Sequence, residues 1–173
     1  MPLDFIPAPR RVRLLWIFIA LNLGFYAVFW WLDQPLRTPA APTGIVSYEL
    51  AASPAAANSM LASWDETARV SAAFGLGFDF LFMPSYAIAL SLAVMLAAGR
   101  RRGQFWSAVG KTLSWAAFIA VGFDAVENIA LFSILLNVAA SPLPELAFVC
   151  AVAKFLILLF GIVYALIGWL FSQ

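Results

Sequence analysis

One long apolar stretch decides the fold: AVGKTLSWAAFIAVGFDAVENIALFSILLNV, residues 108–138. It is longer than the ~20 residues that a helix needs to cross a bilayer. Its charged residues are only Lys111, Asp124 and Glu127. Apolar runs of more than about 18 residues are typical of transmembrane helices. This stretch therefore predicts a membrane-spanning helix, although one that carries an unusual polar group in its second half.

The composition of the whole chain supports the same interpretation. The 173 residues are 64% hydrophobic and 11% charged, and the mean hydropathy is +0.94. Soluble domains are closer to half apolar and a quarter charged. The net charge of +1 indicates no nucleic-acid partner. We expect a polytopic helical protein whose main surroundings are the lipid bilayer.

Three further apolar runs can cross a membrane, at about residues 14–32, 74–98 and 145–171. With 108–138 they predict an all-α fold, a four-transmembrane-helix bundle that forms a single domain over residues 1–173.

The first run ends in two tryptophans rather than in a small-residue cleavage site, so we expect an uncleaved helix and not a signal peptide.

The basic residues predict the orientation of this bundle. Lys and Arg gather before the first span and between the second and third spans, and are sparse in the other two connections. By the positive-inside rule, both termini are cytoplasmic. We expect a multi-pass protein of the bacterial inner (cytoplasmic) membrane. The tryptophans that would mark the inner interface are Trp16, Trp106 and Trp169, and those at the outer interface are Trp30 and Trp31.

The connection over residues 33–73 is the largest segment outside the predicted spans. Ser53 and Pro54 are typical of a helix N-cap followed by a first-turn proline. Apolar residues then recur at helical spacing and predict a short amphipathic helix over about 54–70. This helix can be an ordered connector or a lid over a membrane pocket. The apolar positions are Met60, Leu61, Trp64 and Ala68.

Asp124, Glu127 and Asn128 are spaced at i, i+3 and i+4, so they share one helical face. A charged side chain at the centre of a bilayer costs at least ~2.5–3.5 kcal/mol. We therefore expect this face to be turned into the bundle. The same residues can simply hold helices together, or they can line a functional cavity.

Other polar residues fall at a similar predicted depth. With a rise of about 1.5 Å per residue, Asn22, Glu127, Asn128 and Lys154 all lie near the midplane of their spans. We predict Glu127 and Lys154 as a pair at the floor of a polar cavity. Asp79 lies nearer the outer end of its span, and Pro84 should kink that helix. Asp79 and Tyr86 are therefore expected at the mouth of the cavity.

The sequence contains no His, no metal-ligand spacing, no phosphate-binding loop and no nucleophile motif. The single cysteine, Cys150, cannot form an internal disulfide. We therefore predict no metal and no cofactor, and no residue is singled out as catalytic. Whether the protein is an enzyme stays open.

Two family resemblances accompany these residues. The segments LGFDFLF and FDAVENIAL resemble those of uncharacterised small bacterial integral membrane proteins with four spans. The segment FGLGFDFLFMPSYAIAL, together with Asp33-Gln34, is faintly similar to the EXPERA group, which includes emopamil-binding protein and the sigma-2 receptor. That likeness implies a helical bundle with an acidic cavity for sterols or amphiphilic amines. The third span departs from the EXPERA pattern, and without His sterol isomerisation is not implied.

The leading hypothesis is that the protein binds, or moves, a lipophilic or amphiphilic small molecule. Its ligand-binding candidates are Asn22, Asp79, Tyr86, Asp124, Glu127, Asn128 and Lys154. A second hypothesis is a membrane scaffold whose polar layer docks another helix. A third is a proton- or cation-coupled carrier, which would act as a homo-oligomer because four spans are few for a carrier.

Overall fold

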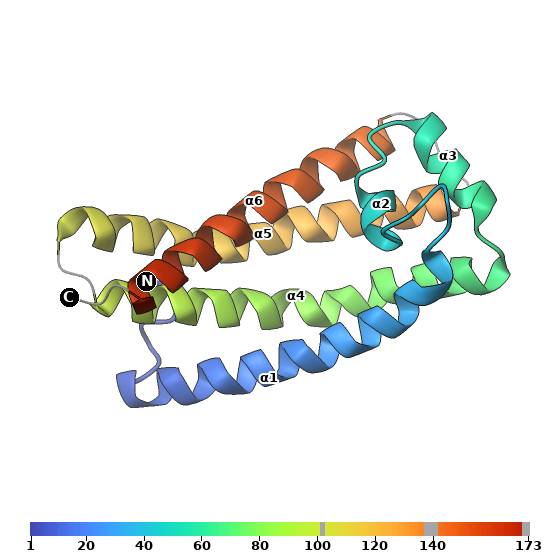
Figure 1. The fold of residues 1–173 in the computed structure, drawn as a ribbon. Coiled ribbons are helices and arrows are strands. Elements are labelled where there is room, and N and C mark those ends of the chain that lie inside the picture. Colours follow the sequence, from blue (N-terminus) through green and yellow to red (C-terminus); the bar gives the residue numbers. More distant parts are fainter. Residues whose placement is uncertain (101–102, 137–141, 171–173) are drawn as a thin grey trace. The chain divides into compact units, whose positions relative to one another are not determined.

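The computed structural model describes residues 1–100, 103–136 and 142–170. Within these residues the chain forms α-helices and one short 3-10 helix, η1, and no strand (Figure 1). The elements are α1 (Ala8–Asp33), η1 (Gln34–Leu36), α2 (Ile45–Glu49), α3 (Pro54–Ser63), α4 (Glu66–Arg100), α5 (Gln104–Leu135) and α6 (Leu143–Leu170).

Four of these helices, α1, α4, α5 and α6, are long and apolar enough to cross a membrane. The predicted all-α fold and its bundle of four long apolar helices are therefore confirmed. They indicate a multi-pass membrane protein in a lipid bilayer. The cytoplasmic placement of the termini stays a prediction.

The helices begin earlier than the apolar runs that predicted them. α1 begins at Ala8 rather than at residue 14, α4 at Glu66 rather than at 74, and α5 at Gln104 rather than at 108. Hydropathy marks only the apolar part of a helix, whereas a helix continues through polar turns until its cap. The predicted ends at 138 and 171 lie outside the described residues, as do Arg101 and Arg102.

The predicted helix over 54–70 is in fact two helices. Ser53 does cap α3, because its side-chain oxygen accepts from the Ala56 N–H at 3.3 Å. The helix ends at Ser63, and Trp64 is extended, with φ −95° and ψ 127°. Asp65 then starts α4, since its Oδ1 accepts from the Ala68 N–H at 2.8 Å. An N-cap aspartate therefore interrupts an apolar pattern that alone favours continuity.

The chain divides into two compact units. Unit 1 consists of Met1–Leu23, Met83–Gly122 and the chain from Lys154 onward, and unit 2 consists of Gly24–Phe82 and Phe123–Ala153. Each of the four long helices contributes one segment to each unit.

Unit 1 is stabilised by close approach of α4, α5 and α6. A Cβ added at Gly168 would lie 2.5 Å from the Cβ of Ala97, and one at Gly161 would lie 2.8 Å from Cδ2 of Leu90. The Tyr164 hydroxyl donates to the Trp106 carbonyl at 2.8 Å. Small residues at such crossings allow helix backbones to pack closely in a membrane. The buried core here is Leu90, Val94, Ala97, Ala98, Ala117, Tyr164 and Ala165.

Unit 2 has a core of a different kind. Residues 34–64, which we call the cap, pack against segments of α4, α5 and α6. The Tyr48 hydroxyl donates to the Leu131 carbonyl of α5 at 3.2 Å, and Trp64 Nε1 donates to the Leu36 carbonyl at 2.8 Å. The rings of Tyr48 and Trp64 meet edge to face, with centroids 5.1 Å apart. The cap is therefore a packed connector, and its action as a lid stays a prediction.

Asp33 anchors the start of the cap. Its Oδ1 accepts from the Ile45 N–H at 2.8 Å, and its Oδ2 accepts from Arg37 Nε at 2.9 Å. Gly44, at φ +60°, leaves room for this carboxylate, because a Cβ there would lie 2.0 Å from Asp33 Oδ1. Only glycine combines this positive φ with the absence of a Cβ, so only glycine fits here without strain.

Candidate functional site

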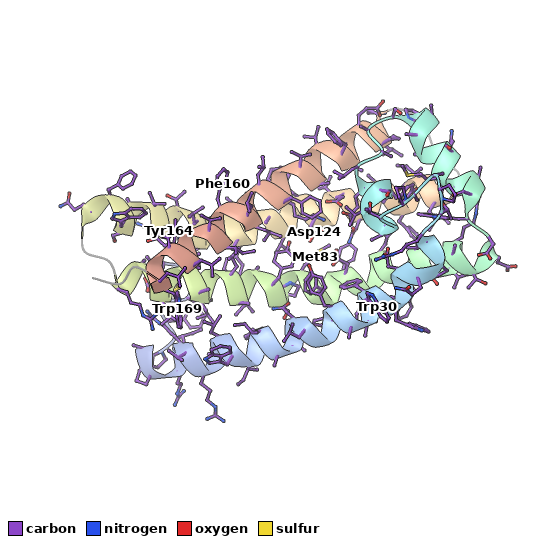
Figure 2. The ribbon with its side chains drawn as sticks, viewed as in Figure 1. Trp30, Met83, Asp124, Phe160, Tyr164 and Trp169 are labelled. Carbon is purple, nitrogen blue, oxygen red and sulfur yellow. The ribbon has the colours of Figure 1, made fainter. Side chains whose placement is uncertain are left out.

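The polar face of α5 is buried. The exposed fractions are 2% for Asp124, 0% for Glu127 and 2% for Asn128, and Figure 2 labels Asp124. Their neighbours Val126 and Ile129 are 43% and 60% exposed. The helix thus turns its apolar side outward and its carboxyl and amide groups inward, as their spacing predicted.

Asn128 joins α5 to α4 within unit 2. Its Nδ2 donates to Asp79 Oδ2 at 2.7 Å and to the Leu76 carbonyl at 3.3 Å. This contact corrects the prediction that Asp79 lies at a shallower level than Asn128. The depth of Asp79 was counted from residue 74, whereas α4 begins at Glu66. Asp79 is therefore about 20 Å along its helix, and it hydrogen-bonds to a residue expected deeper in the membrane.

The other candidates fall in different units. Asp79, Asp124, Glu127 and Asn128 belong to unit 2, whereas Asn22, Tyr86 and Lys154 belong to unit 1. Tyr86 is 8% exposed and Lys154 is 6% exposed. The Lys154 ammonium lies 4.8 Å from the ring centroid of Phe155, within the range of a cation–π contact. The predicted pairing of Glu127 with Lys154 stays a prediction.

Charge is divided between the units. Unit 1 holds a single acidic residue, Asp4, and unit 2 holds only two basic residues, Arg37 and Arg69. Arg37 contacts Asp33, and Arg69 donates to the Leu61 carbonyl at 2.7 Å, so both arginines are engaged with the cap region. The other basic residues, all in unit 1, are Arg10, Arg11, Arg13, Arg100, Arg101, Arg102, Lys111 and Lys154.

Asn22 has a neighbour that sequence reasoning did not single out. Its Nδ2 donates to the Phe18 carbonyl at 2.7 Å and makes a longer contact, 3.5 Å, with the Ser85 carbonyl of α4. Two atoms of this group, Asn22 Oδ1 and Ser85 Oγ, are buried without a hydrogen-bond partner in the described chain. A serine in an apolar helix usually bonds its own backbone, so no pattern in the sequence distinguishes Ser85.

Among the described residues, no three Asp, Glu or Cys side chains group in a way that could hold a metal ion. Comparisons of the chain with known protein families, with curated proteins and with solved structures gave no match. The four apolar helices fit a small four-span membrane protein. The family resemblances themselves stay predictions.

Proposed function

We propose that this membrane protein binds a lipophilic or amphiphilic small molecule through the acidic and amide side chains of unit 2. The burial of Asp124 and Glu127 in an apolar helix carries this proposal. Polar contacts between membrane helices contribute only ~0.6 kcal/mol on average, whereas a central charge costs at least ~2.5–3.5 kcal/mol. Helix packing alone gives little reason to place two carboxyls on this face.

The charge of unit 2 favours a ligand with a cationic headgroup. Eight of the nine acidic residues of the chain belong to this unit, against two arginines. An excess of one sign of charge raises the local concentration of ligands of the opposite sign. An amphiphilic amine therefore fits unit 2 better than a fatty acid does. The faint EXPERA resemblance adds sterol-like lipids as a second class to test.

Asp79 is the best candidate for direct ligand contact. Asp79 is partly exposed, whereas Asp124, Glu127 and Asn128 are buried. The Asn128 amide donates to Asp79 Oδ2 at 2.7 Å, which orients this carboxylate beside the buried polar face of α5. Asn22, Tyr86 and Lys154 belong to unit 1, so they stay predicted ligand-binding residues outside this proposal.

We also propose that both termini are cytoplasmic and that the protein resides in a bacterial inner membrane. Eight of the ten basic residues belong to unit 1, which also contains Met1–Leu23 and the chain from Lys154 onward. An excess of Lys and Arg marks the cytoplasmic side. The cap would then lie on the outer side.

The test is equilibrium binding of a fluorescent cationic amphiphile to the full-length protein in nanodiscs. We expect Asp79→Asn to weaken binding about tenfold or more, because an ammonium–carboxylate contact in a low dielectric is strong. Glu127→Gln should weaken it as well, because it removes a buried carboxyl from the same unit. The matched control is Glu66→Gln, which removes one negative charge from an exposed position of the same unit. Binding that is unchanged in both test variants would refute the proposal.

The scaffold and carrier hypotheses predict different results. A scaffold would cross-link to a stoichiometric partner in native membranes and would bind no amphiphile. A carrier would take up solute into proteoliposomes in response to a pH gradient. Neither is favoured by a particular contact in the structure.

A further inference from the structure

Two buried polar atoms in unit 1 lack a hydrogen-bond partner among the described residues. They are Oδ1 of Asn22, on α1, and Oγ of Ser85, on α4. Ser85 is 3% exposed. Buried polar atoms are nearly always paired, and inside a bilayer no bulk water is available to replace a missing partner. These two atoms therefore point to a bound group that satisfies them.

Asn22 and Ser85 are neighbours, and the polar atoms that they leave without a partner define the ligand group that can bind there. The Asn22 amide nitrogen is used, since it donates to the Phe18 carbonyl at 2.7 Å and contacts the Ser85 carbonyl at 3.5 Å. What is left is a carbonyl-type acceptor on Asn22 and a hydroxyl on Ser85 that can donate or accept. A ligand must therefore supply at least one donor.

The charge of unit 1 restricts the ligand further. The only acidic residue of the unit is Asp4, which precedes α1, so the membrane-spanning part of unit 1 contains no carboxylate. This unit therefore offers no counter-charge within the membrane to a cationic group. An anion cannot donate to Asn22 Oδ1. The ligand group is therefore neutral.

A hydroxyl attached to a hydrocarbon fits better than a water molecule. One O–H can donate to Asn22 Oδ1, and its oxygen can accept from Ser85 Oγ. A buried water makes about two to four hydrogen bonds, so what favours an alcohol over water is the apolar surface beside the two atoms and not the number of atoms. Apolar residues one and two turns away from Asn22 and Ser85 pack in one cluster. They are Leu15 and Ile19 on α1, and Ile88 and Leu92 on α4.

The site is also reached from the lipid more easily than from water. The most apolar window of α1 is only 6% buried, against 28% to 56% for the other three long helices. The α1 side chains Ile17 and Leu21 are 49% and 45% exposed. A molecule that approaches Asn22 along α1 therefore passes over hydrocarbon-facing side chains.

We propose that Asn22 and Ser85 bind the hydroxyl of a lipophilic, uncharged alcohol, with Asn22 Oδ1 as acceptor and Ser85 Oγ as donor. The alkyl or ring portion of this molecule lies along the apolar α1 and α4 surfaces of unit 1. This inference goes beyond the function proposed above, because it concerns the other unit and a ligand without charge.

The test compares dodecanol with dodecyl methyl ether, which has a similar chain but no donor. The full-length protein in detergent is unfolded by heat with each compound. We expect dodecanol, at about five times its Kd, to raise the wild-type Tm by about 2–4 °C, and the ether to raise it by much less. Ser85→Ala and Asn22→Leu should each abolish the difference between alcohol and ether.

Ser91→Ala is the matched control, on the same helix and in the same unit. The Ser91 hydroxyl is already bonded to that of Ser114 at 2.8 Å, so this variant should lower the Tm without ligand and keep the response to dodecanol. Ser85→Ala should not lower the Tm without ligand, because it removes an atom that lacks a partner. A photoreactive fatty alcohol should label α1 or α4, and dodecanol should compete with it.

Two outcomes would overturn the inference. In the first, the alcohol and the ether stabilise the wild type equally, or Ser85→Ala keeps the alcohol response. In the second, Ser85→Ala alone destabilises the protein as much as Ser91→Ala, which would mean that a protein group or a fixed water already satisfies the hydroxyl. Binding of the cationic amphiphile and its loss in Asp79→Asn are measured separately, so each proposal can fail alone.

Discussion

Unit 1 and unit 2 are built from the same four long helices, yet different contacts stabilise them. In unit 1 the helices approach so closely that Gly161 and Gly168 leave no room for a side chain. In unit 2 the cap contributes large rings, and Tyr48 and Trp64 fill the core that it forms with α4, α5 and α6. Close backbone packing thus holds one unit, and side-chain filling holds the other.

The two units also differ in the charge of their side chains. Unit 1 is basic and its membrane-spanning part has no carboxylate, whereas unit 2 contains Asp79, Asp124 and Glu127 in its membrane-spanning helices. The two ligand classes that we propose, a neutral alcohol for unit 1 and a cationic amphiphile for unit 2, match this division. Experiments that affect one unit and spare the other test whether the contrast is real.

The largest expected effect concerns the core of unit 2. Trp64 is 4% exposed, and its ring contacts Tyr48. Trp64→Ala should lower the free energy of unfolding by about 3–5 kcal/mol, as large cavities do. Trp31→Ala is the control, since Trp31 is 68% exposed. Denaturant titration in detergent measures both, and similar losses in the two variants would mean that the cap does not pack as described.

The next effect concerns the close packing of unit 1. In Gly168→Ala the new Cβ would lie 2.5 Å from the Ala97 Cβ and 3.1 Å from its Cα. The backbone must move to admit it, so we expect a loss of about 1–3 kcal/mol. Gly122→Ala is matched in unit and residue type, because nothing lies within 4 Å of its Cβ position, and it should be neutral or stabilising. Equal Tm values for the two variants would contradict close helix packing in unit 1.

A smaller, pH-dependent effect concerns Tyr48. Tyr48→Phe should cost about 1 kcal/mol at neutral pH, since it removes the bond to the Leu131 carbonyl. Burial raises the pKa of the Tyr48 phenol above its ordinary value of 10.0. The folded state therefore holds this proton more tightly than the unfolded state does. The resulting stability is complete below pH 10 and decreases as the pH rises further.

Tyr48→Phe should remove that decrease, so the two stability profiles should converge above pH 10. Tyr26→Phe, at a 65% exposed position, is the control and should leave the decrease in place. Thermal unfolding over a series of alkaline buffers measures the profiles. Parallel profiles for wild type and Tyr48→Phe would show that the phenol is not buried in the folded state.

These contrasts also show what the sequence could and could not predict. The number and class of the long helices follow from apolar length, because a bilayer requires ~20 such residues. The inward face of α5 follows from the spacing of Asp124, Glu127 and Asn128, and the cap of α3 follows from Ser53. Each of these features depends on residues that are close together in the sequence.

The features that could not be predicted depend on position in space. Leu61, Trp64 and Ala68 all join one core although the helix breaks between them, so their spacing alone did not reveal the break. The contact between Asp79 and Asn128 was missed because a helical rise gives depth only from a known helix start. Ser85 differs from other membrane serines only in its surroundings.

The smallest expected effect tests whether charge contributes to the cap. The Arg37–Asp33 pair has an N···O distance of 2.9 Å, but the arginine side chain is 51% exposed. Arg37→Gln should therefore cost only about 0.2–1 kcal/mol, and less at high salt. Asp33→Asn should cost more, because the Asp33 carboxylate also accepts from the Ile45 N–H. Urea titration at low and high salt measures both variants. A loss in Arg37→Gln as large as that in Trp64→Ala would show that an ion pair, and not the packed rings, holds the cap in place.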